Sequence, residues 1–224
     1  MRRKRNGKRK TSWIAATAVL LAAAAASAQT PAAPADASAL LAKASAVYGD
    51  GSAHEAAFTQ IYTPSGFTTA RRESGTVWIQ APERLRFDYE APERKTFTYD
   101  AGEGRLYTPE DRQLSIQQVS PEDRQRLPIV FFADPSRLAR LYEITTEPAE
   151  PGLARLRLRP RSEESELARL EISIEKDGTV AELAYEDVSG NRTEFRFQDW
   201  RIEKGKPAAH YRVTGPPGTR EIEN

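Results

Sequence analysis

Hydrophobic and polar residues alternate most clearly between residues 75 and 100. The apolar positions of this stretch are Val77, Ile79, Leu85, Phe87, Tyr89, Phe97 and Tyr99. Neighbouring side chains on a strand point to opposite faces, so the pattern predicts three short antiparallel strands with one apolar and one charged side. Pro82 and Pro92 separate the three runs, at points where no ladder donor is needed.

The rest of the chain predicts one leading helix and more strands. A stripe of apolar residues predicts a helix over 37–48, and Asp36 or Ser38 can cap it. Further strands are expected at 54–63, 105–108, 113–119, 142–146, 153–159, 167–175, 180–187, 192–200 and 210–214. Consecutive hairpins of this kind predict a mainly β domain, with about eleven strands in a single antiparallel sheet.

Residues 120–140 form the one long irregular stretch. Three prolines interrupt it, and the apolar run Ile129-Val130-Phe131-Phe132 lies between them. The pattern predicts two short helices here. Long segments inside a β domain are usually functional or disordered, and an apolar one is a poor candidate for disorder.

The start of the chain predicts export. Residues 2–10 hold seven Lys or Arg, residues 13–26 are apolar, and Ala26-Ser27-Ala28 is a small-x-small site. This is typical of a signal peptide at 1–28, followed by a disordered Pro/Ala spacer at 29–37 and one domain at 38–224. A retained membrane anchor is the alternative, although the run is short for a span of about 20 residues.

Charge and cysteine content narrow the class of protein. The whole chain has 33 basic and 32 acidic residues, and removal of the seven leader bases changes the net charge from 33 − 32 = +1 to 26 − 32 = −6. An acidic domain is a poor nucleic-acid binder, so we expect no such partner. The chain has no cysteine, so it has neither disulfides nor an N-terminal cysteine for lipid attachment.

No motif of the sequence carries catalytic chemistry. His54 and His210 lack metal-ligand spacing, and there is no G-x-S-x-G or phosphate loop. We therefore expect no catalytic residue, metal or cofactor, although a pair of catalytic carboxylates stays open. The alternating arginines of 155–159 are either a phosphate-binding stripe or, with Glu171 and Glu175 on the next strand, cross-strand ion pairs on a wet face.

An ordered set of short motifs gives a family resemblance. The central one reads Trp78-x-x-x-Pro82-x-Arg84-Leu85-Arg86-Phe87-x-Tyr89-x-x-Pro92, and the others are Phe58-Thr59-Gln60, Asp100-Ala-Gly-Glu-Gly104, Leu106-Tyr107, Gln113 and Pro217-Gly218. Together they resemble the LolA family, the periplasmic carriers of outer-membrane lipoproteins. The resemblance covers about residues 39–222.

The resemblance implies an open half-barrel whose concave side is covered by the leading helix and a short helical lid. It implies a monomeric, non-enzymatic periplasmic carrier that takes acylated lipoprotein or lipid cargo from an inner-membrane ABC-type exporter to an outer-membrane acceptor. The expected lipid-binding residues are Val77, Ile79, Leu85, Phe87, Tyr89, Phe97, Ile129, Phe131 and Phe132, of which the last two form the lid. In any other β domain the strand residues of this set would be ordinary core.

One position departs from the family. The family often has an Arg before the first proline of the central motif, where it latches the lid, and this chain has Ala81. Arg84 and Arg86 are close in sequence but are expected on the opposite face. A lid without a latch should open more readily when empty. Two other functions stay open: a sensor or scaffold that binds a protein or lipid signal on the same fold, and, more remotely, a hydrolase.

Overall fold

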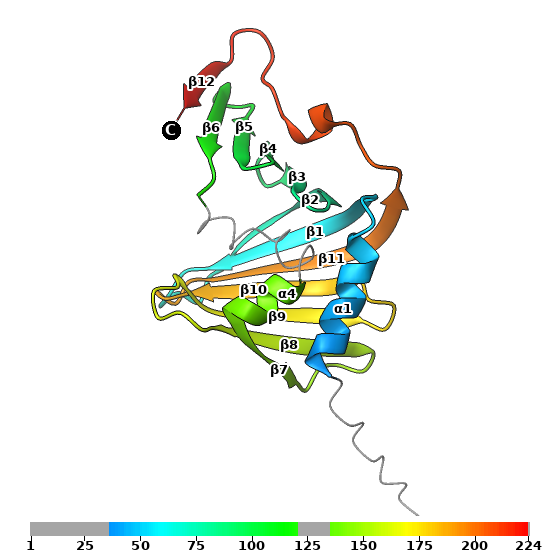
Figure 1. Ribbon diagram of the computed structural model, residues 1–224. Coiled ribbons are helices and arrows are strands. Elements are labelled where there is room, and N and C mark those ends of the chain that lie inside the picture. The colour runs from blue at the N-terminus through cyan, green and yellow to red at the C-terminus, as the bar shows by residue number, and fades with distance from the viewer. Residues whose placement is uncertain (1–35, 121–134, 224) are drawn as a thin grey trace, which may run out of the picture. The chain divides into compact units, whose positions relative to one another are not determined.

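The structure is a computed structural model that describes residues 36–120 and 135–223. Within these residues twelve strands form one sheet, in the order β12-β6-β5-β4-β3-β2-β1-β11-β10-β9-β8-β7 (Figure 1). The edge strands β12 and β7 do not pair with each other, so the sheet is open. The prediction of a mainly β domain with an open sheet and few helices is confirmed.

Strands β1 to β11 lie at or near the predicted positions, whereas β12 was not predicted. Their bounds are β1 Ala53–Thr63, β2 Arg71–Gln80, β3 Arg84–Ala91, β4 Lys95–Asp100, β5 Glu103–Thr108, β6 Gln113–Gln118, β7 Tyr142–Glu147, β8 Leu153–Pro160, β9 Leu167–Glu175, β10 Val180–Asp187, β11 Arg192–Glu203 and β12 Arg220–Glu223. Neighbouring strands pair antiparallel, except that β12 runs parallel to β6. The expectation of a wholly antiparallel sheet is therefore wrong at this edge.

The predicted strand at 210–214 is also wrong. Residues Ala208–Tyr211 form a short 3-10 helix, η1, that follows Pro207. Tyr211 and Val213 are buried because the segment crosses the charged side of the sheet, where the Val213 amide donates to the Thr98 hydroxyl at 3.2 Å. The segment thus alternates between buried and exposed residues because it lies across the sheet, and not because it is one of its strands.

The leading helix α1, Ala37–Tyr48, has the predicted bounds and the predicted cap. The Asp36 carboxylate accepts a hydrogen bond of 2.9 Å from the Ser38 amide. Leu41, Ala44 and Tyr48 form its buried stripe. The helix crosses the half of the sheet that contains β7 to β11, and the shorter helix α4, Pro135–Leu141, lies beside it (Figure 1).

The other half of the sheet is covered on its opposite side. Residues 204–219 cross the charged side of β2 to β5 and are held by side chains of those strands. Gln80 accepts from the Lys206 amide at 2.8 Å and from the Tyr211 hydroxyl at 3.1 Å. Arg86 donates to the His210 carbonyl at 2.9 Å. We call residues 204–219 the C-terminal strap.

Candidate functional site

Four of the predicted lipid-binding residues lie together in the core. Val77, Ile79, Leu85 and Phe87 share one face of β2 and β3, where Val77 is in register with Phe87 and Ile79 with Leu85. Each of the four side chains is at most 3% exposed. We call this side of the sheet the apolar face. The alternation therefore identified the correct face, and contact of these residues with a ligand stays a prediction.

Aromatic rings join the strands across the middle of the apolar face. The Phe58 ring on β1 meets the Phe87 ring on β3 edge to face, with a centroid separation of 4.9 Å. Phe87 in turn lies 5.5 Å from Phe195 on β11. Edge-to-face rings add stability beyond the area that they bury. The centre of the apolar face is thus a packed surface of large side chains.

The apolar face becomes polar near the end of β3. The Tyr89 hydroxyl donates to the Gln60 side-chain carbonyl at 2.7 Å, and Lys95 lies 4.4 Å from the centre of the Tyr89 ring. Lys95 also pairs with Glu73 at 2.5 Å. Burial, reinforced by the nearby Glu73 carboxylate, raises the pKa of Tyr89, so its hydroxyl stays a neutral donor. Tyr89 therefore presents a ring to the core and a polar tip to this end.

Beyond β3 the apolar face is less covered. Phe97 on β4 is half-buried, and its register partner Leu106 on β5 is 37% exposed. Leu106 was not among the predicted site residues. In the sequence Gly104 and Leu106 alternate with polar neighbours. This alternation is too short to show whether the strand is covered or exposed on its apolar side.

A cavity opens at the other edge of the sheet. It has a volume of about 370 Å³ and lies between the start of α1, α4 and β7. Its lining residues are Ala37, Ser38, Leu41, Ala139, Tyr142, Ile144 and Arg161. We call this cavity the edge pocket. Of the predicted lipid-binding residues that the structure describes, none lines it, because periodicity along one strand does not show where two helices leave a gap.

The predicted lid falls outside the described part of the chain. Ile129, Phe131 and Phe132 lie within 121–134, so the lid stays a prediction. Of the two short helices predicted between residues 120 and 140, the second is found as α4, Pro135–Leu141. Arg84 and Arg86 are the arginines closest in sequence to the position of the missing latch, and the structure describes both. Arg84 donates to Asp100 at 3.2 Å and Arg86 to Asp88 at 2.9 Å, on the face opposite Leu85 and Phe87. The expectation that neither arginine replaces the latch at Ala81 fits this geometry.

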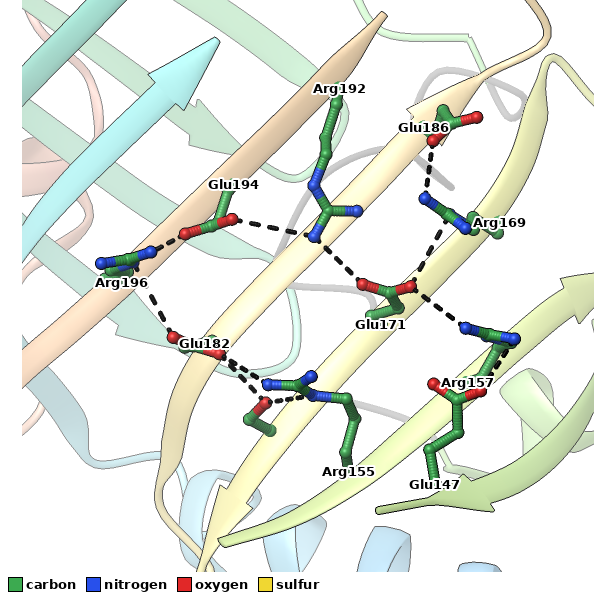
Figure 2. A network of polar contacts seen from close by, with 11 residues as sticks. Glu147, Arg155, Arg157, Arg169, Glu171, Glu182, Glu186, Arg192, Glu194 and Arg196 are labelled. Carbon is green, nitrogen blue, oxygen red and sulfur yellow. Dashed lines mark hydrogen bonds and ion pairs between the residues drawn. The ribbon is translucent and has the colours of Figure 1, made fainter. Parts of the chain in front are cut away.

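The charged side of β7 to β11 carries a network of ion pairs (Figure 2). Glu171 is its centre, at 3.0 Å from Arg192, 3.6 Å from Arg169 and 3.8 Å from Arg157. Glu147, Arg155, Glu182, Glu186, Glu194 and Arg196 complete it. The structure therefore supports cross-strand pairing over a phosphate-binding stripe. In the described residues Arg159 and Glu175 stand outside this network.

Three polar residues near the start of β1 resemble a catalytic triad in composition only. The Ser52 hydroxyl donates to Asp50 at 3.0 Å, and the His54 ring lies 3.8 Å from the other Asp50 oxygen. A nucleophilic serine needs a hydrogen bond to its base, and here the serine bonds to the acid instead. The described residues contain no cluster of three or more His, Cys, Asp or Glu that could hold a metal ion.

Comparison with known proteins decides the family. The model described as "Outer membrane lipoprotein carrier protein LolA" matches residues 51–212, which is more than half of the chain. The chain belongs to the LolA family. The match includes β1 to β11, the aromatic centre of the apolar face and most of the C-terminal strap.

Curated relatives agree with this assignment. The outer-membrane lipoprotein carrier protein of Xanthomonas campestris strain B100 is 26% identical over 163 residues, which cover 72% of this chain and 77% of that protein. The protein of the same name from Methylibium petroleiphilum is 25% identical over 167 residues, which cover 75% and 81%. Proteins of the LolA family are carriers and not enzymes, and the predicted periplasmic location is confirmed.

A solved structure illustrates the shared fold. An uncharacterized conserved protein from Thermus thermophilus aligns with a TM-score of 0.53 at 12% identity, over 83% of this chain and 98% of that one. This likeness concerns the fold alone. No helix among the described residues is both long and apolar enough to span a membrane.

Proposed function

We propose that this LolA-family protein carries acylated lipoproteins through the periplasm, from an inner-membrane ABC-type exporter to an outer-membrane acceptor. The observation that carries the proposal is the incomplete cover of the apolar face. Phe97 and Tyr89 are half-buried and Leu106 is 37% exposed, in a family whose curated relatives are named as lipoprotein carriers.

The energetics favour enclosure of the cargo. Each methylene removed from water contributes about 0.8 kcal/mol, so one long acyl chain contributes roughly 10 kcal/mol and three chains about three times as much. A carrier has to cover most of this area, because otherwise the cargo returns to the first membrane that it meets. It also has to release the cargo, so a cover that changes position between the empty and loaded states is required.

The aromatic centre supplies a firm floor for such a site. Phe58, Phe87 and Phe195 are packed against one another, so the cargo lies beyond them, over β4 and β5. In this proposal Ile129, Phe131 and Phe132 supply the movable cover. The lid has no arginine latch at Ala81 and therefore opens with little resistance. The carrier acts as a monomer. Its domain, residues 38–224, follows the leader peptide 1–28 and the spacer 29–37 in the chain.

The test is native mass spectrometry of the protein isolated from the periplasm of cells that make a tagged lipoprotein. We expect a complex with acylated lipoprotein, and we expect Leu106→Glu to reduce its yield about tenfold, because a carboxylate on the apolar face has to be dehydrated when the cargo binds. Val188→Glu is the matched control, since Val188 is 66% exposed on the turn between β10 and β11.

Two results would contradict the carrier function. A protein free of acyl material that captures a non-acylated protein would favour a sensor or scaffold. Equal loss of cargo in Leu106→Glu and Val188→Glu would show that the apolar face does not bind the cargo, because the two substitutions add the same charge at different places.

A further inference from the structure

A hollow lies in the middle of the charged side of β8 to β11. Its volume is about 220 Å³, and Ala184 on β10, which is buried, forms its floor. Ala184 is in register with Glu171 on β9 and with Glu194 on β11. A methyl group among long charged side chains leaves a space above itself, so the hollow is the consequence of one small residue. We call it the charged hollow.

Positive and negative side chains alternate around the charged hollow (Figure 2). Ser173 joins two of them, since its hydroxyl accepts from Arg155 and donates to Glu182, both at 3.2 Å. Each charged side chain is held by at least two neighbours, so the charged groups are in place before a ligand arrives and little ordering is required on binding. The order around the hollow is Arg155, Glu182, Arg196, Glu194, Arg192 and Glu171.

The size of the charged hollow suits one side chain. Its volume is below the range of roughly 300–1,000 Å³ that sites for whole small molecules occupy. A water molecule takes about 30 Å³ of liquid volume, so the hollow has room for on the order of seven non-hydrogen atoms. An arginine side chain contains about that number. The hollow is therefore too small for a typical small-molecule ligand and large enough for one long side chain of another protein.

The charge of the lining favours a cation. The surrounding network consists of five arginines and five glutamates, whose charges balance. Glu150 lines the hollow in addition to these, and it is exposed. Within the described part of the chain the Glu150 carboxylate forms no ion pair. The hollow thus has one negative charge more than the arginines around it neutralise.

Two further carboxylates retain an oxygen that can accept a hydrogen bond. The nearest arginine nitrogen to Glu182 Oε1 is 3.8 Å away, and the nearest to Glu194 Oε2 is 3.7 Å away, among the residues that the structure describes. Both distances exceed that of a hydrogen bond. A guanidinium group has five donors in a planar fork that matches carboxylate oxygens, whereas an ammonium group is a compact point charge. The set of acceptors therefore suits arginine better than lysine.

We propose that the charged hollow binds one arginine side chain of a partner protein, with the guanidinium group at Glu150 and at the available oxygens of Glu182 and Glu194. The site lies on the charged side of the sheet, opposite the apolar face, and it shares no residue with the proposed cargo site. The inference therefore does not rest on the carrier function.

The experiment is an NMR titration of the mature protein with the amide of Nα-acetyl-L-arginine, followed through the backbone amides of Ala184 and Ser173. We expect saturable binding with a dissociation constant in the millimolar range, since a single side chain forms only a few charge-assisted hydrogen bonds. The amide of Nα-acetyl-L-citrulline has the same shape without the charge, and we expect it to bind about tenfold more weakly.

Three variants locate the binding. Glu150→Gln should weaken binding of the arginine amide about fivefold, the worth of an exposed ion pair. Ala184→Leu fills the hollow from its floor and should abolish binding, as read at Ser173. Glu175→Gln is the matched control, because Glu175 is exposed on the same strand as Ser173 but does not line the hollow. Glu150 is exposed on a loop, so its variant keeps the test valid if Ala184→Leu fails to fold.

The carrier function is tested separately. Leu106→Glu, which should lose lipoprotein cargo, is expected to bind the arginine amide as the parent does, because it lies on the other face of the sheet. Loss of cargo with unchanged arginine binding, or the reverse, therefore shows which of the two proposals fails.

Binding of the arginine amide that is weakened by Glu150→Gln and lost in Ala184→Leu supports the proposal. The proposal is overturned if the arginine amide does not bind at tens of millimolar, or if the citrulline amide binds as tightly. It is also overturned if Glu150→Gln and Glu175→Gln have equal effects, or if Ala184→Leu folds and binds as before. Tighter binding of free L-arginine than of its acetylated amide would overturn it too, because the ligand would then be an amino acid and not a protein.

Discussion

The hydroxyl of Tyr48, in the last turn of α1, accepts a hydrogen bond of 3.0 Å from the backbone amide of Val180 on β10. The Val180 carbonyl is engaged as well, because the Trp200 indole donates to it at 2.8 Å. Val180 is the first residue of β10, and the side chains of Tyr48 and Trp200 supply hydrogen-bond partners for its amide and its carbonyl. The last turn of the helix is thus anchored to β10.

Removal of the Tyr48 hydroxyl should destabilise the protein. Tyr48→Phe keeps the ring in place but leaves the Val180 amide buried without an acceptor, and we expect the free energy of unfolding to fall by about 1–2 kcal/mol. Urea denaturation followed by tryptophan fluorescence measures it. Tyr62→Phe on β1, where the ring is half-buried, is the control. Equal stability of Tyr48→Phe and the parent would show that water replaces the hydroxyl.

The Asp100 carboxylate should make stability depend on pH in the acid range. Burial by itself would raise the pKa of Asp100, but hydrogen bonds from Arg212 at 2.9 Å and Arg84 at 3.2 Å outweigh it and hold the pKa below its usual value. The stabilisation by the ionised Asp100 carboxylate is therefore fully present above the pKa of the unfolded chain, about 3.9, and is lost as the pH falls through the lower pKa of the folded protein.

Asp100→Asn tests this linkage. The variant should be less stable than the parent by about 1–2 kcal/mol at pH 7, since two charged hydrogen bonds lose their anion. The difference should shrink as the pH falls below about 4, because the Asp100 carboxyl then takes up a proton and becomes neutral like the amide of Asn. The readout is thermal unfolding across this range. A difference that stays constant with pH would show that packing, and not charge, is at work.

His54 should make stability fall on mild acidification. Its side chain is 1% exposed, and this burial lowers the pKa of His54, although the Asp50 carboxylate 3.8 Å away offsets part of the effect. The unfolded chain then takes up the proton first, so stability decreases as the pH falls below the unfolded value of about 6.5.

The measurement for His54 is a pair of titrations. NMR of the imidazole protons should place its pKa below the ordinary value, and His54→Gln should remove part of the stability loss between about pH 7 and pH 5. His210→Gln gives the comparison, because burial also lowers the pKa of His210. A normal or raised pKa of His54 would contradict the burial argument.

Glu171 should matter more than the other acids of its network. It faces three arginines on β8, β9 and β11, and its side chain is 15% exposed. Glu171→Gln leaves all three without this partner, and we expect a loss of about 1–2 kcal/mol. Glu186→Gln removes only the 2.9 Å pair with Arg169, and we expect less than about 0.5 kcal/mol.

Salt separates the charge effect of Glu171 from packing. Urea denaturation in low and high salt should show the Glu171→Gln difference shrinking as the salt concentration rises, because mobile ions screen partly exposed pairs. Equal effects of the two substitutions would mean that the network acts as independent surface pairs.

Much of the fold follows from local periodicity. The side chains of Val77 and Phe87 alternate with polar neighbours, and this alone places them on the buried face of their strands. Likewise, Asp36 and the Leu41 stripe define α1 within its own sequence. The strap was misread because Tyr211 and Val213 alternate like a strand, although their partners Gln80 and Thr98 lie more than a hundred residues away.

The sequence by itself determined β1 to β11, the leading helix and the face on which the apolar residues of these strands lie, because these depend on spacing along one segment. Only the tertiary structure decided which part of that face is covered. The strap closes the charged side of β2 to β5, while α1 and α4 close the apolar side near β7. On the apolar face Phe87 is buried against the rings of Phe58 and Phe195, whereas Leu106 on β5 is open. Cover depends on contacts between distant segments, and periodicity along one strand carries no record of them.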